Sequence, residues 1–239
     1  MKDIFQKSFT FISENISDLV QLVLPPALIF AALITLSSML PGTAGALMVF
    51  FAEVLANAFI SASLIRYISA RSYNQPTSVQ QALLAGVAYT PAILLLYLLL
   101  SIPLMPWLFA GEQFSSQNAF ALSFSTFIFF YIAIKATFAD YLIVLDGKST
   151  LGAIATSFRY TTGYVHKIVI VMMLSFIVSG FFQIMFFQPL EPGVSPDKAS
   201  EFITKAIELI INFVTTILIF YIFTDSYLEN QKAHLSKVK

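Results

Sequence analysis

Four ionisable residues stand inside otherwise apolar stretches of the chain, where a charged side chain is costly. Glu53 has apolar neighbours, Lys135 and Asp140 share a second apolar stretch, and Glu208 stands in a third. An ionisable residue inside a membrane span costs at least about 2.5–3.5 kcal/mol, so it usually faces the interior of a helix bundle or water. These four residues are therefore the intramembrane candidates for a functional site.

Three interpretations of these charges are open. An ion pair between Glu53 and Lys135 would offset both desolvation costs if the two residues lie at similar depth. Alternatively, Glu53, Lys135 and Asp140 line a polar pathway for an ion, a proton or a lipid headgroup. In the third interpretation, the side chains reach the membrane surface or water and have no function.

Motifs for catalysis are missing from the sequence. It contains no His-Glu-x-x-His, no Gly-x-Ser-x-Gly and no glycine-rich phosphate loop. The absence of Cys excludes disulfides and thiolate metal sites, and two His residues, His166 and His234, are too few for an imidazole metal centre. Asp140 and Asp146 would lie on different faces of a continuous helix. We therefore expect no enzyme, no catalytic residue, no metal and no cofactor.

The composition indicates an integral membrane protein. Apolar residues make up 58% of the 239 residues and charged residues only 11%, whereas soluble domains have roughly 45–50% and about 25%. The mean hydropathy of +0.82 agrees with this class. The balance of 13 basic and 13 acidic residues argues against a nucleic-acid partner, because such proteins need an excess of Lys and Arg to neutralise phosphates.

Apolar stretches between the charges predict an all-α fold with six transmembrane helices in a single domain, residues 1–239. A span needs about 20 mostly apolar residues, and Pro41-Gly42 separates the first two spans with a turn signal. An amphipathic surface helix is expected over 3–17, because its apolar residues recur at helical spacing. The spans are expected at about 19–40, 44–69, 90–109, 118–145, 167–187 and 202–222.

Lys and Arg residues are distributed unequally between the two sides of these spans. Ten fall on the side of the termini, whereas the opposite loops hold only Lys198 and Lys205, with Lys135 left out as intramembrane. Because cytoplasmic loops carry the excess of Lys and Arg, we expect both termini to be cytoplasmic in a multi-pass protein of a bacterial inner membrane. The ten residues are Lys2, Lys7, Arg66, Arg71, Lys148, Arg159, Lys167, Lys232, Lys237 and Lys239.

Two further surface helices, about 78–88 and 149–161, resemble each other at an offset of 71 residues. Ser, Ala, Tyr and Thr recur identically, and Ser78 with Gln81 fits the capping box at a helix N-terminus. Together with the N-terminal helix, this pattern predicts three parallel repeats of a surface helix followed by a helical hairpin. The alternative is a chance similarity between apolar segments of low complexity.

The surface helix over 149–161 has an apolar stripe between two basic residues. A Lys or Arg beside a cytoplasmic leaflet gains about 1 kcal/mol from anionic lipid. The basic residues near the predicted membrane surface are therefore candidates for lipid-headgroup binding, and simple interfacial anchoring is the alternative. The candidates are Lys148, Arg159, Arg66 and Arg71.

The stretch from Ala133 to Ile168, which contains IKATFADYLIVLDGKSTLGAIATSFRYTTGYVHKI, resembles the YciC-like proteins, as does Asn57 to Ser72. These are small bacterial inner-membrane proteins of unassigned function. A related arrangement occurs in the membrane domain of some glycerophosphodiester phosphodiesterases, but this chain has no catalytic domain of that kind. The resemblance implies an inner-membrane location and a role in envelope or lipid homeostasis.

Taken together, these features predict a non-enzymatic protein that binds membrane lipids or a membrane partner. The alternative is a small transporter or channel with a polar path through Glu53, Lys135 and Asp140. The sequence leaves the substrate and the oligomeric state open.

Overall fold

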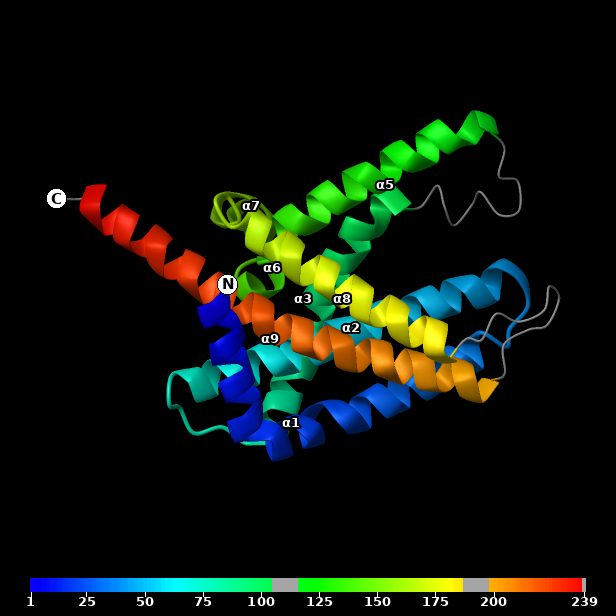
Figure 1. Ribbon diagram of the computed structural model, residues 1–239, viewed down its shortest axis with the longest axis horizontal. Coiled ribbons are helices and arrows are strands. Elements are labelled where there is room, and N and C mark those ends of the chain that lie inside the picture. Colours follow the sequence, from blue (N-terminus) through cyan, green and yellow to red (C-terminus); the bar gives the residue numbers. More distant parts are fainter. Residues whose placement is uncertain (105–115, 187–197, 238–239) are drawn as a thin grey trace.

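The computed structural model describes residues 1–104, 116–186 and 198–237. In these ranges the chain forms helices and connecting turns, without strands, and six of the helices are long and apolar enough to cross a membrane. The predicted all-α class, six spans and multi-pass membrane character are confirmed (Figure 1).

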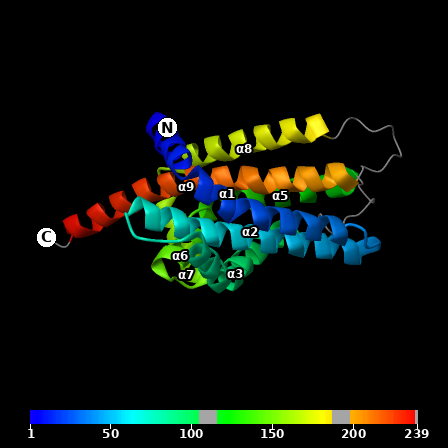
Figure 2. The same ribbon diagram turned by 90° about the horizontal axis from the view of Figure 1, so that it is seen from below.

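The helices follow one another up and down the bundle. In both views the N-terminus and the C-terminal end of the last helix lie opposite the turn between the first two helices (Figures 1 and 2). We call the end with both termini the basic end, because Lys2, Arg71 and Lys167 lie there. The elements are α1 (Lys2–Ser37), α2 (Gly42–Ser72), α3 (Val79–Ser101), the 3₁₀ helix η1 (Ile102–Leu104), α5 (Ser116–Ala136), α6 (Ala139–Asp146), α7 (Thr150–Tyr160), α8 (Val165–Phe186) and α9 (Lys198–Lys237).

Helix α1 contains both the expected surface helix and the first span. It bends at Asn15, whose φ of −117° and ψ of 15° are not helical. The Asn15 side chain donates to the Phe11 carbonyl at 2.9 Å, a local bond that competes with the helical hydrogen-bond ladder. The first four turns therefore cross the end of the bundle while the rest of α1 runs along it (Figure 1).

Helix α3 differs from the expected surface helix over 78–88 with a separate span from 90. The capping box of Ser78 and Gln81 is present, but the helix continues through Pro91. Proline suits a helical φ, and polar groups nearby can satisfy the carbonyl that it leaves unpaired. After α7, by contrast, Gly163 adopts a φ of +92°, which a glycine adopts without steric cost, and a turn separates α7 from α8.

The fourth span is not the continuous helix expected over 118–145. It breaks between α5 and α6 at Thr137 and Phe138. Ser157 of α7 bridges the break: its hydroxyl donates to the Lys135 carbonyl at 2.8 Å and accepts the Phe138 N–H at 3.0 Å. Ser157 is fully buried, so α7 is part of the bundle and does not only lie on a membrane surface.

Small side chains on α2 let neighbouring helices approach closely. Ala58, Ala62 and Ser63 are almost completely buried, and Gly86 of α3 lies directly against Ser63, without room for a side chain at this position. Small residues are typical of contacts between membrane helices because they bring the backbones together. Helix α2 accordingly lies between α1, α3 and α9 at the centre of the bundle.

The segments at the offset of 71 share their first turns. Ser78 and Ser149 are both N-caps that accept a backbone N–H, and Ala82 and Ala153 are both completely buried. The helices then differ, since α3 continues into a span and α7 ends at Tyr160. The threefold repeat stays a prediction.

Replacing Ser157 with Ala should destabilise the fold. The change leaves the Phe138 N–H and the Lys135 carbonyl without their bridge, which costs about 1–3 kcal/mol for a buried group. Thermal unfolding of the detergent-solubilised protein should show a lowered Tm. Thr156→Ala on the same helix is the control, because Thr156 bonds only within α7 and to Lys148. Equal Tm values for the two variants would show that the bridge is unimportant.

Candidate functional site

Helix α2 carries a polar stripe through its apolar sequence. Glu53, Asn57 and Ser61 are four residues apart and therefore lie on one face of the helix. The Asn57 side chain donates to the Glu53 carbonyl at 2.9 Å. Ser61 is buried, and Glu53 and Asn57 are half-buried. Polar residues at this spacing in a membrane helix need partners on a neighbouring helix.

Helix α9 provides those partners. The Lys205 amine lies 2.7 Å from Glu53 Oε1 and 3.1 Å from Glu208 Oε2. Further along α9, the Asn212 side-chain amide donates to Asn57 Oδ1 at 2.9 Å. We call this row the polar seam; it comprises Glu53, Asn57 and Ser61 of α2 and Lys205, Glu208, Asn212 and Thr215 of α9.

The predicted ion pair between Glu53 and Lys135 is wrong. Glu53 pairs with Lys205, and the Lys135 amine lies 3.5 Å from the Thr162 hydroxyl. Lys135 belongs to the last turn of α5, and its long side chain extends toward the basic end, where Thr162 precedes α8. Lys205, expected on the loop side, lies instead within α9 and neutralises a charge in the bundle.

A cavity of about 450 Å³ lies beside the polar seam. Helices α2, α3, α5, α6, α8 and α9 contribute to its wall, which combines apolar side chains with hydroxyl and amide groups. We call this cavity the chamber. Its polar lining residues are Asn57, Ser61, Tyr97, Ser101, Thr137, Asp140, Tyr141, Asn212, Thr215 and Thr216.

Asp140 places a carboxylate on the wall of the chamber. Its side chain is 9% exposed, and Oδ1 accepts the Tyr141 backbone N–H at 3.0 Å. The Tyr97 hydroxyl lies 3.4 Å from Asp140 Oδ2 and 3.2 Å from the Ser61 hydroxyl. This network joins the carboxylate to the polar stripe on α2.

The break in the fourth span explains the position of Asp140. Because α6 begins at Ala139, Asp140 lies in its first turn, where the partial positive charge of a helix N-terminus favours a carboxylate. A continuous helix over 118–145 would not offer this environment. The Ser157 bridge thus holds the helix end that carries Asp140.

Toward the basic end, tightly packed aromatic rings follow the chamber. Tyr141 stacks on Phe223 with ring centroids 5.3 Å apart, and Phe138 meets the same ring edge-on at 5.5 Å. These three residues and Phe220 are at most 3% exposed. We call these four residues the aromatic plug. Tyr141 also lines the chamber, so the packed rings adjoin the chamber on this side.

Away from the plug, the chamber adjoins a second cavity of about 270 Å³. The two cavities share Met172, Asn212 and Thr215, and Glu208 of the polar seam lines the second one. The Ser175 and Thr215 hydroxyls lie 2.6 Å apart between α8 and α9. The polar surface therefore runs from Asp140 toward Glu208.

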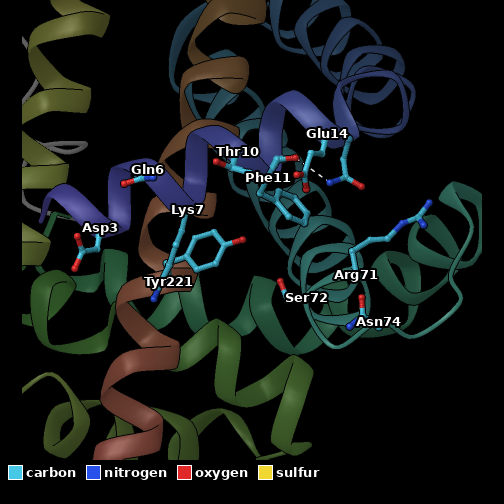
Figure 3. A pocket seen from close by; sticks show the side chains of 11 residues that line it. Asp3, Gln6, Lys7, Thr10, Phe11, Glu14, Arg71, Ser72, Asn74 and Tyr221 are labelled. Atoms are coloured by element: carbon cyan, nitrogen blue, oxygen red, sulfur yellow. Dashed lines mark hydrogen bonds between the residues drawn. The ribbon is translucent and has the colours of Figure 1, made fainter.

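A separate pocket of about 730 Å³ lies at the basic end, between the first turns of α1, the end of α2 and Tyr221 of α9 (Figure 3). Lys7 and Arg71 line it, but so do Asp3 and Glu14. Arg71 also pairs with Asp18 at 2.7 Å, and Lys7 lies 3.9 Å from an Asp225 oxygen. Because both cations already face carboxylates, this pocket offers little net attraction for an anionic headgroup.

The other predicted headgroup residues do not converge on one cavity. Arg66 is exposed on α2. Lys148 donates to the Thr156 hydroxyl at 3.0 Å, and the Arg159 guanidinium lies 5.5 Å from the centre of the Tyr160 ring. These residues stand at separate places of the basic end, and their interfacial role stays a prediction.

Sequence reasoning missed most of the polar seam. The spacing of Glu53, Asn57 and Ser61 was a usable signal, since three polar residues recur every four positions in an apolar helix. Helix α9 has a similar pattern, because Lys205, Glu208, Asn212 and Thr215 follow one another at intervals of three or four residues. Tyr97 had no such signal, because it is one tyrosine in an otherwise apolar segment.

Within residues 1–104, 116–186 and 198–237, no group of three His, Cys, Asp or Glu side chains could hold a metal ion.

Comparison with known proteins finds no matching family model, no matching curated protein and no matching solved structure. The resemblance to the YciC-like proteins therefore stays a prediction.

The pair between Glu53 and Lys205 can be tested with a double-mutant cycle. Glu53→Gln and Lys205→Met should each lower the free energy of unfolding, because the first removes one of the two carboxylates beside the Lys205 amine and the second leaves Glu53 without its cation. The double variant should recover part of the loss, with a coupling energy of about 0.5–3 kcal/mol. The same cycle with Glu53→Gln and Lys135→Met is the control and should show additive losses. Coupling to Lys135 and not to Lys205 would contradict the observed pairing.

Proposed function

We propose that this protein is a non-enzymatic membrane protein that binds the headgroup of a lipid or another amphiphile in the chamber. The volume of about 450 Å³ lies within the range of about 300–1,000 Å³ that ligand pockets have. The wall has hydroxyl, amide and carboxylate groups for a headgroup and apolar groups for the beginning of its chains. Such a mixed lining fits an amphiphile better than a fully polar solute.

The observation that carries this proposal is the exposure of Asn212. This residue lies 14 positions into α9, on a helix long enough to span a membrane, yet its side chain is exposed in the chamber wall. The Asn212 amide donates to Asn57, but the rest of this polar group would lose its hydrogen bonds with water if it lay against hydrocarbon. A headgroup that enters sideways from the bilayer would supply polar contacts at this depth.

The aromatic plug favours binding over conduction. A channel needs a polar route to both ends of the bundle, whereas the polar surface beyond Asp140 gives way to packed rings and aliphatic side chains. The chamber is therefore better suited to hold a headgroup than to pass an ion.

Transport is the second candidate function, and the adjoining cavity with Glu208 favours it. A carrier would move the plug aside in another conformation. Flux in reconstituted vesicles distinguishes the two: lipid that co-purifies without flux supports binding, and substrate flux that depends on Asn57 or Asp140 supports transport.

We further propose an inner membrane of a bacterium as the location, with the basic end in the cytoplasm. Ten Lys and Arg residues on the side of the termini, against Lys198 near the opposite end, support this orientation. Together with the YciC-like resemblance, a headgroup site accords with a role in lipid or envelope homeostasis.

Filling the chamber should prevent lipid binding. Ala133→Phe adds a ring to the wall of the chamber, and native mass spectrometry of the detergent-solubilised protein should show at least about tenfold less retained lipid, equivalent to about 1.4 kcal/mol. Ala155→Phe, on the exposed side of α7, is the control and should retain lipid. Unchanged retention in a folded Ala133→Phe variant would place the lipid elsewhere.

A further inference from the structure

We propose that the chamber prefers amphiphiles whose headgroup carries a cationic amine, and that Asp140 pairs with this amine. The proposal rests on the proposed function, because it names the class of ligand that the chamber binds.

The charge on the chamber wall has one sign. Among the lining residues that the structure describes, Asp140 is the acidic one and none is Lys, Arg or His. The nearby charge of Glu53 has its own partner, since Lys205 lies 2.7 Å away. The wall that a ligand meets therefore bears the charge of Asp140.

Cations of the protein do not compensate this carboxylate. Among the residues that the structure describes, no ion pair includes Asp140. Lys135 and Lys148 are near in sequence, but their amines lie against the hydroxyls of Thr162 and Thr156. A carboxylate buried in a membrane bundle is ordinarily paired, and here the open cavity beside Asp140 is the place from which a cation can come.

The surroundings of Asp140 suit an ammonium group. An ammonium has three N–H donors and no acceptor, and two hydroxyl residues, Ser61 and Thr137, line the chamber together with Asp140. The aromatic residues Tyr97, Phe129 and Tyr141 also line it, and aromatic faces attract cations, more strongly when water is excluded. An anionic headgroup would meet the same carboxylate and be repelled.

The experiment compares ligands that have a cationic amine with matched ligands that have none. Full-length protein in a nonionic detergent is mixed with dioleoyl phosphatidylethanolamine or with its N-acetyl derivative, and native mass spectrometry measures the retained lipid. We expect at least about tenfold more retention of the free amine. A second comparison, of oleylamine with oleyl alcohol, tests the amine without a phosphate. If the protein prefers the amine only in the phospholipid pair, its ligand is a phospholipid amine and not a simple alkylamine.

Variants then assign the preference to Asp140. Asp140→Asn should reduce the preference for the amine to about twofold or less, whereas Asp146→Asn, which removes an exposed carboxylate from the same helix, should leave it unchanged. If Asp140→Asn does not fold, Asp140→Glu keeps the charge and should keep the preference. The comparison of ligands on the unaltered protein needs no variant.

Two results separate the failure of this inference from that of the proposed function. Equal retention of the free and acetylated lipids, both lost in Ala133→Phe, would overturn the amine preference and leave the chamber as a lipid site. Retention that Ala133→Phe does not affect would overturn both. An amine preference that persists in folded Asp140→Asn would reject Asp140 as the partner.

Discussion

Hydrocarbon offers no hydrogen-bond partners, so the polar stripe on α2 can be stable in a membrane only if another helix meets it. Helix α9 does so, with Lys205 against Glu53 and Asn212 against Asn57. This match sets which face of α9 packs on α2, although the two helices are far apart in sequence. The chamber lies beside this contact, where the polar groups of the two helices face a cavity and each other.

The break between α5 and α6 has the same physical origin. An interrupted helix leaves backbone groups without partners, and a membrane bundle must satisfy them internally. Ser157 does this from α7. The packing of α7 therefore stabilises the break, and the break sets the position of Asp140. The Tyr97 hydroxyl then connects Asp140 to Ser61 and thus to the polar seam.

The sequence predicts the features that depend on local patterns. Six spans follow from hydropathy, and the capping box at Ser78 follows from four neighbouring residues. The partner of Glu53 could not be predicted, because it depends on which helix face α9 presents at that depth. The break at Thr137 and Phe138 has no Gly or Pro to signal it and is held by a serine twenty residues later in the chain. Asp140 is a candidate from the sequence because it is an ionisable residue in an apolar span. The fold adds its contact with Tyr97 and a cavity that it shares with Asn57 and Asn212.

We expect a headgroup to occupy the chamber beside Asp140. An experimental structure of the protein in nanodiscs that contain phosphatidylethanolamine and phosphatidylglycerol tests it most directly. We expect headgroup density between Asp140, Asn57 and Asn212. A chamber that holds only ordered water, continuous through the aromatic plug to the basic end, would contradict it and favour conduction.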